Sequence, residues 1–82
     1  MARIIDYEAQ NVVGEKVKKF REERNLSQKA FSEKLETKAI YICRGSISRI
    51  ESHERTVTDF ELRAMAQILR VSVEELFEEM SV

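Results

Sequence analysis

A pattern typical of helix starts recurs four times along this chain. It consists of an apolar residue, a residue that can cap a helix, and a second apolar residue four positions after the cap. The two apolar side chains pack together and fix the direction in which the chain enters the helix. The four occurrences are Leu26, Ser27 and Phe31; Ile42, Cys43 and Ile47; Val57, Thr58 and Leu62; and Val71, Ser72 and Leu76.

Glutamates strengthen two of these starts. Glu61 follows Thr58 by three positions and Glu75 follows Ser72 by three, the spacing of a capping box in which side chain and backbone cap each other. Cysteine is a poor cap, so the start at Cys43 is weaker. With an apolar stripe beginning at Val13, the pattern predicts helices over Val13–Arg24, Gln28–Lys38, Arg44–Ser52, Asp59–Leu69 and Val73–Met80.

These helices predict an all-α fold, a compact five-helix bundle. Asn25 stands where the chain leaves the first helix, and asparagine tolerates the left-handed conformation that such an exit uses. No segment alternates long enough to indicate a strand, and residues 39–43 are expected to be a connection. Eighty-two residues suffice for one domain. We expect this domain over residues 13–82, preceded by an N-terminal arm over residues 1–12.

Composition excludes several classes of protein. Cys43 and His53 are the only residues of their types, too few for an internal disulfide or a structural zinc site, so no metal or cofactor is expected. They also offer no catalytic triad, and an enzyme is not expected. No segment approaches the ~20 apolar residues of a membrane span. The single cysteine fits a reducing cytoplasm.

The net charge of -1 conceals an uneven distribution. Residues 16–55 hold eleven Lys and Arg against six Asp and Glu, a balance of +5, whereas residues 56–82 hold two against six, a balance of -4. Such a division is typical of a face that binds a polyanion and a separate acidic surface. The alternative is that mixed charges simply solvate the helix faces.

The second and third predicted helices, joined by a connection, suggest a helix-turn-helix unit. In that unit the second helix of the pair enters the DNA major groove and its early residues face the base edges. With Ile47 and Ile50 facing the core, the residues expected to contact bases are Arg44, Gly45, Ser46, Ser48 and Arg49. An arginine can donate two parallel hydrogen bonds to guanine. Gly45 either lets the backbone approach DNA closely or is a tolerated small residue.

Phosphate contacts are expected around this helix. The start of the second helix, with Ser27, Gln28 and Lys29, presents free backbone N–H groups and the positive end of the helix dipole. Lys38 and Arg55 flank the third helix and can add further contacts. In each case the alternative is a solvated polar side chain.

The runs NLSQKAFSEKL and ISRIESHERTVTDFELRAMAQILRVSVEELF resemble the phage-repressor and Cro-like helix-turn-helix family of bacterial regulators. The resemblance covers roughly residues 13–77. It implies a five-helix lambda-repressor-like domain that binds DNA through its third helix, usually as a symmetric dimer on a palindromic site. By this match Gln28 falls on a phosphate-contacting position, and Arg44, Gly45 and Arg49 fall on positions that usually contact bases.

The chain departs from the family pattern in two places. Residues 36–43 form a longer connection than the usual tight turn, with Ile40 and Ile42 expected to pack beneath it. Ser52 and His53 stand where the family often has Asn-Gly, so His53 must adopt or avoid a left-handed exit. It is either an exposed turn residue or a phosphate contact.

Two further side chains have open roles. Glu51 is expected to be structural, paired with a base such as Arg21 or Arg24. Cys43 is either a small residue at a helix start or a redox-sensitive thiol.

These observations predict a sequence-specific, double-stranded-DNA-binding transcriptional regulator, with a repressor favoured. It is expected to form a homodimer on a palindromic operator through Leu69, Phe77 and Met80, although these residues can instead close the core. Two alternatives stay open: an antitoxin that also binds a toxin, and a protein-interaction module without DNA binding.

Overall fold

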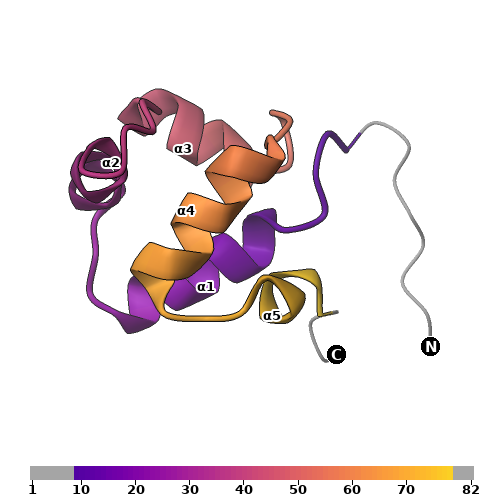
Figure 1. Cartoon of the computed structure of the whole chain (residues 1–82). Coiled ribbons are helices and arrows are strands. Elements are labelled where there is room, and N and C mark those ends of the chain that lie inside the picture. Colours follow the sequence, from indigo (N-terminus) through magenta and orange to yellow (C-terminus); the bar gives the residue numbers. More distant parts are fainter. Residues whose placement is uncertain (1–8, 79–82) are drawn as a thin grey trace.

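The computed structural model describes residues 9–78, which form five helices and no strand. The helices are α1 (Gly14–Glu23), α2 (Gln28–Glu36), α3 (Arg44–Glu51), α4 (Asp59–Leu69) and α5 (Val73–Phe77) (Figure 1). The predicted all-α class is confirmed. Within this part of the chain, no helix has the length and apolar character needed to cross a membrane.

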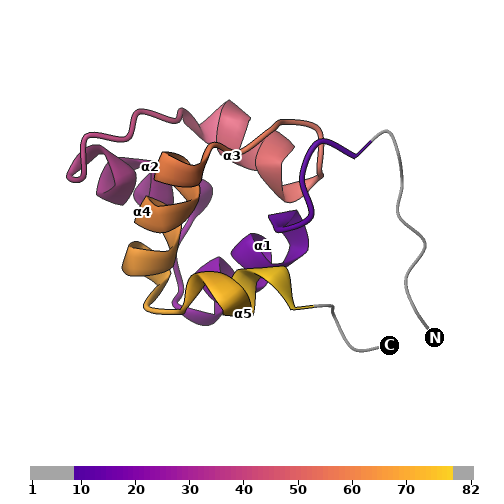
Figure 2. The same cartoon turned by 45° about the vertical axis from the view of Figure 1, so that its right-hand side comes forward.

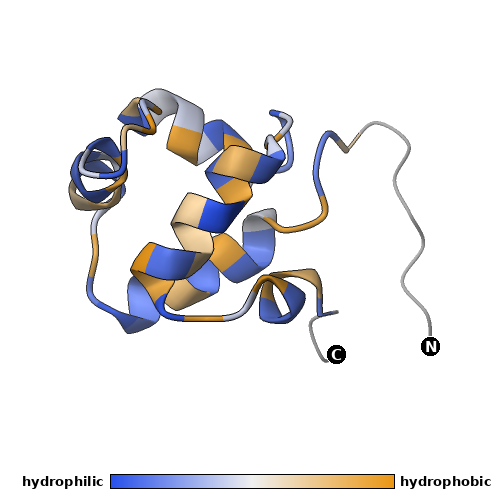
Figure 3. Ribbon diagram, in the orientation of Figure 1, coloured by the Kyte–Doolittle hydropathy of each residue, from blue (hydrophilic) through white to orange (hydrophobic). Residues whose placement is uncertain are grey.

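The helices pack around one centre. In Figures 1 and 2, α3 and α5 lie on opposite sides of the bundle, and α4 leads from the side of α3 to the side of α5. Helix α1 contacts α3, α4 and α5. Figure 3 shows apolar and polar residues mixed along the helices, as expected for helices that bury one face.

The predicted helix starts are the most accurate part of the sequence analysis. The side chains of Ser27, Thr58 and Ser72 each accept a hydrogen bond from the backbone N–H three residues later. At Thr58 the capping box is complete, because the Glu61 side chain also accepts from the Thr58 N–H. At Ser72 only the serine half of the box forms. Cys43 precedes α3 without a side-chain capping bond, as its poor capping ability predicted.

Four of the five helix ends differ from the prediction, whereas α4 ends at Leu69 as predicted. Helix α2 stops at Glu36 instead of Lys38, because Ala39 adopts a left-handed conformation (φ 61°). The N–H of Ile40, the next residue, then donates to the Leu35 carbonyl. Helix α5 stops at Phe77, because the following Glu78 is extended. Helices α1 and α3 each end one residue earlier than predicted. The left-handed exit at Asn25 (φ 56°) is confirmed.

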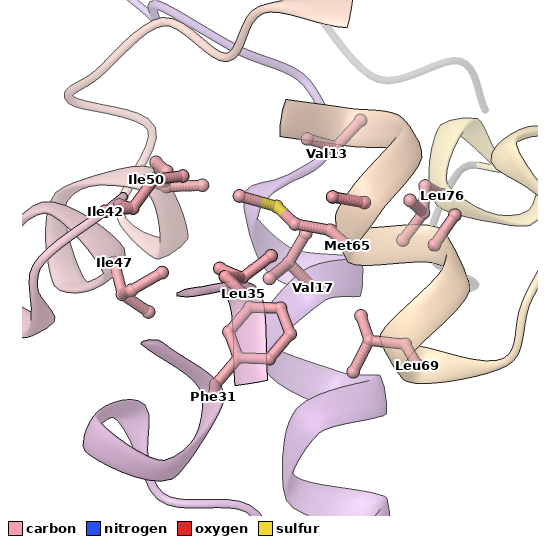
Figure 4. Packing of buried hydrophobic residues seen from close by; sticks show 12 residues of the cluster. Val13, Val17, Phe31, Leu35, Ile42, Ile47, Ile50, Met65, Leu69 and Leu76 are labelled. Atoms are coloured by element: carbon pink, nitrogen blue, oxygen red, sulfur yellow. The ribbon is translucent and has the colours of Figure 1, made fainter. Parts of the chain in front are cut away.

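The core draws on every helix and on the α2–α3 connection (Figure 4). Its largest side chains all have less than 2% of their surface exposed. Leu69 is among these, at 0% exposure, so its placement in a dimer surface was wrong. The apolar side of α4 faces the core, and Leu69 is used entirely within one chain. The buried apolar residues are Val13, Val17, Phe31, Leu35, Ile42, Ile47, Ile50, Ala64, Met65, Ala66, Leu69 and Leu76.

Helix α1 begins directly against the end of α3. A Cβ atom added at Gly14 would lie 2.2 Å from the backbone oxygen of Ile50 and 3.0 Å from that of Glu51. No side chain larger than hydrogen fits there unless the two helices separate. Gly14 therefore allows the backbones of α1 and α3 to lie close together at this point.

Gly14→Ala should destabilise the fold by at least the ~1–3 kcal/mol typical of overpacking, since the obstructing atoms are backbone and cannot rotate away. Unfolding in urea, followed by circular dichroism, measures the loss. Gly45→Ala is the matched control, because nothing lies within 4 Å of a Cβ atom at Gly45. Gly45→Ala should leave the free energy of unfolding unchanged or raise it by up to ~1 kcal/mol. Equal stability of Gly14→Ala and the parent would contradict this account of the α1–α3 contact.

Candidate nucleic-acid interface

The connection between α2 and α3 is attached to the domain at both ends. The Ile40 N–H donates to the Leu35 carbonyl at 3.1 Å, and the Ser32 hydroxyl donates to the Ile42 carbonyl at 2.5 Å in a buried position. Ile42 is 2% exposed, and Ile40 packs against the core. The expected packing of both isoleucines is confirmed. Despite its length, the connection therefore holds α3 in a defined orientation to α2.

Helix α3 buries Ile47 and Ile50 completely and turns its other side outward. Exposed on that side are Arg44, Gly45, Ser48 and Arg49, while Ser46 is half-buried. The Arg49 guanidinium donates to the Ser46 hydroxyl at 3.4 Å, whereas the Arg44 side chain forms no hydrogen bond or ion pair within residues 9–78. The five residues expected to contact bases thus share the solvent side of one short helix.

The segment that leads into α3 and forms its outward side carries charge of one sign. Residues 37–50 contain Lys38, Arg44 and Arg49 and no acidic residue. Within the described part of the chain, neither Lys38 nor Arg44 is paired with a carboxylate. Because no carboxylate is paired with these two cations, their charge stays available to attract an anionic ligand to the outward side of α3.

Cys43 lies at the N-terminus of α3 and is exposed. A hydrogen bond with the Ser46 side chain, assisted by backbone N–H groups of the first turn, lowers the pKa of the Cys43 thiol. This is the effect expected at a helix N-terminus. The thiol therefore belongs to the same polar surface as Ser46 and Arg49.

The start of α2 supplies polar groups beside α3. Ser27 caps the helix, and Lys29 is exposed and unpaired within the described residues. The Gln28 amide donates to Glu51 at 3.1 Å. An amide nitrogen carries two hydrogens, so the second one remains available to an anion. Gln28 can thus be held by the protein and still donate outward.

Glu51 forms the centre of a buried ion pair. Its carboxylate accepts from Arg21 Nε at 2.6 Å and from Arg21 Nη2 at 3.1 Å, while Arg21 Nη1 donates to the Leu26 carbonyl at 2.6 Å. The side chains of Arg21 and Glu51 are only 9% and 4% exposed. The hydrogen bond to Glu51 raises the pKa of Arg21, against the opposing effect of burial. Of the two bases considered for Glu51, the partner is Arg21.

Arg24, the other candidate, lies elsewhere. Its guanidinium is 5.2 Å from the centre of the Phe20 ring and 3.4 Å from the Glu23 carboxylate. Of these two arginines, only Arg21 therefore connects α1 with the end of α3.

Arg55 is engaged within the protein. Its two terminal nitrogens each donate to an oxygen of Glu61 at 3.1 Å, and Nη1 also donates to the Thr56 carbonyl. Burial opposes ionisation of Glu61, but the bonds from Arg55 and Thr58 outweigh it and lower the Glu61 pKa. The pair holds the α3–α4 connection. Phosphate contact by Arg55 stays a prediction, and it would compete with Glu61.

His53 is half-buried and left-handed (φ 66°), so the chain makes here the exit that glycine usually makes. Its Nδ1 lies 3.0 Å from the Asn11 carbonyl oxygen, and its Nε2 lies 3.4 Å from a Glu15 oxygen. The expectation of an ordinary exposed turn residue was wrong. Contacts with Asn11 before α1 and with Glu15 in the first turn of α1 hold the ring in place.

Asn11 is a structural residue that the sequence analysis missed. Its amide donates to the carbonyls of Ile50 and Arg55, and its Oδ1 accepts from the Gly14 N–H. An asparagine three residues before a helical N–H has the spacing of a helix cap, so a signal was present. The division between an arm and a domain at residue 12 stays a prediction, although Gln10 and Asn11 are both bonded to the α3–α4 region.

The remaining expected dimer residues have different outcomes. Phe77 is 53% exposed on α5 and is accessible to a partner. Met80 lies outside the described residues. Within residues 9–78, no group of three or more His, Cys, Asp or Glu side chains is placed to hold a metal ion.

A helix-turn-helix family model matches residues 17–76, which include most of α1 and the whole of α2, α3 and α4. The chain therefore belongs to the helix-turn-helix family of the phage-repressor and Cro-like type. Among solved structures, the chain is similar to one described as the crystal structure of the DNA-binding domain of BldD. The TM-score is 0.68 at 24% identity, over 88% of this chain and 97% of that one, which supports the fold. No curated protein matches significantly.

Glu51→Ala should destabilise the fold by ~3–5 kcal/mol, because it leaves the Arg21 guanidinium buried without its partner. Chemical denaturation at neutral pH measures the change. The double variant Arg21→Met with Glu51→Leu removes both charges and should be more stable than Glu51→Ala alone. If the double variant loses more stability than the single one, the unpaired charge is not the cause.

Proposed function

We propose that this protein binds double-stranded DNA as a sequence-specific transcriptional regulator, with α3 entering the major groove. The observation that carries the proposal is the outward side of α3, where Arg44 and Arg49 lie in a segment of residues 37–50 without any acid. Membership of the helix-turn-helix family supports it, as does the likeness to a domain described as DNA-binding.

Direct recognition of bases is assigned to α3. Arg44 is unpaired within the described residues, and Arg49 is bonded only to Ser46, so both can donate to the O6 and N7 atoms of guanine. The hydroxyls of Ser46 and Ser48 can bond bases or phosphates. The open space around Gly45 lets the helix backbone approach the groove without a side chain between them.

Phosphate contacts are assigned to the start of α2 and to Lys38. The backbone N–H groups after Ser27, the side-chain amide of Gln28 and the side chain of Lys29 all belong to the first turn of α2. These contacts carry no sequence information, but they set the position of α3 along the groove.

A homodimer on a palindromic operator is part of the proposal, with repression by occupation of that operator. Exposure of Phe77 on α5 supports a partner surface. Because the family is one of bacterial DNA-binding regulators, we place the activity in the cytoplasm. No catalytic step is assigned to the protein.

The test is selection of bound sequences from random duplex DNA, followed by anisotropy titrations of the enriched sequences at two salt concentrations. A palindromic consensus with salt-dependent affinity is expected. Enrichment of a single half-site without symmetry would contradict the dimer. Absence of binding even at low salt would overturn the proposed function and favour a protein-interaction module. An antitoxin would bind DNA in this test and would also bind a toxin.

Arg44→Ala and Arg49→Ala should each weaken binding to the selected operator by ~1–3 kcal/mol and relax base preference at one position. Lys38→Ala should instead weaken binding to all duplexes alike and reduce the slope of log K against log salt by about one. Anisotropy titrations on the operator and on an unrelated duplex separate these effects.

Arg70→Ala is the matched control for these variants. Arg70 is an exposed arginine that directly follows α4. The end of α4 that leads into α5 lies on the side of the bundle away from α3 (Figure 1). Its removal should leave affinity and consensus nearly unchanged. If Arg44→Ala and Arg49→Ala behave like Arg70→Ala, the placement of the recognition surface on α3 is wrong.

A further inference from the structure

Tyr41 has no role in the core, yet it stands on a firmly held segment. Its side chain is 78% exposed, although it lies between two isoleucines that pack inward. Two hydrogen bonds fix the segment on both sides of Tyr41. The Ser32 hydroxyl donates to the Ile42 carbonyl, and the Ile40 N–H donates to the Leu35 carbonyl. A large aromatic side chain is thus held out in solvent by a fixed backbone.

The direction of Tyr41 follows from the exposure pattern. Along residues 40–43, Ile40 is half-buried, Tyr41 exposed, Ile42 buried and Cys43 exposed. Such alternation is that of an extended segment with one side against the core. Tyr41 and Cys43 therefore lie on the same outward side of the chain, immediately before α3.

Hydrogen bonds connect that side to the outward side of α3. Cys43 Sγ lies 3.5 Å from the Ser46 hydroxyl, which in turn accepts from Arg49 at 3.4 Å. These three residues form a continuous row from the N-cap along α3, in which Cys43 and Arg49 are exposed and Ser46 is half-buried. Tyr41 continues the row beyond the N-terminus of the helix, with Lys38 and Arg44 three residues away on either side in the sequence.

We propose that Tyr41 contacts the sugar–phosphate backbone of the DNA strand at the edge of the groove that α3 enters, an inference that rests on the proposed function. When the N-terminal part of a recognition helix faces the base edges, the chain segment that leads into the helix passes close to the sugar–phosphate backbone beside the groove. The phenol hydroxyl donates to a phosphate oxygen, as tyrosines do in protein–DNA complexes, and the ring covers the adjacent deoxyribose. Tyr41 adds affinity without adding base preference.

The test compares Tyr41→Phe and Tyr41→Ala with the parent, on the selected operator and on an unrelated duplex. Tyr41→Phe removes only the hydroxyl and should weaken both complexes roughly threefold to tenfold. Tyr41→Ala also removes the ring and should weaken both roughly tenfold or more. The salt slope should stay at the parent value, in contrast to Lys38→Ala, because a neutral side chain releases no counterion.

The outcomes separate this proposal from the function on which it rests. Because Tyr41 is exposed, both variants should melt at the parent temperature, which circular dichroism checks. If the parent binds DNA and both variants bind equally well, Tyr41 makes no contact and the function still stands. A loss confined to the operator, or a changed consensus, assigns Tyr41 to bases and overturns the backbone contact. Failure of the parent to bind any duplex overturns both.

Discussion

The buried pair between Arg21 and Glu51 is the interaction on which the rest of the structure depends. It joins α1 to the last residue of α3, and through the Leu26 carbonyl and the Gln28 amide it also holds the start of α2. Two buried charges are costly unless each is fully bonded, and here each has more than one partner. The pair thereby couples the folding of three helices to the geometry of the proposed DNA surface.

The position of α3 is constrained at both of its ends. Near its C-terminal end, Gly14 brings the α1 backbone against the carbonyls of Ile50 and Glu51, and Asn11 bonds the Ile50 carbonyl. Before its N-terminal end, the Ser32 hydroxyl holds the Ile42 carbonyl. A helix fixed in this way presents Arg44 and Arg49 from a rigid support. Recognition of a base sequence requires such a support, because hydrogen bonds to base edges tolerate little displacement.

Helix starts were predictable from the sequence, whereas several helix ends were not. A start depends on a cap and on apolar residues within one turn of it, and all of these are adjacent in the sequence. Four of the ends depend on where the chain turns left-handed, at Asn25, Ala39, His53 and Arg70, whereas α5 ends before the extended residue Glu78. Alanine and arginine have no intrinsic preference for that conformation, so the surrounding packing must impose it.

The sequence by itself determined the number of helices in residues 9–78, the starts of α2 to α5 and the outward side of α3. Helical periodicity around Ile47 and Ile50 leaves only one side of α3 exposed. Tertiary structure alone decided that Glu51 pairs with Arg21, that Arg55 bonds Glu61, and that Leu69 is buried instead of available to a partner. Arg21 and Glu51 are 30 residues apart in the chain. Local patterns identify the residues that can pair or be buried, but only the packing of the helices brings particular ones together.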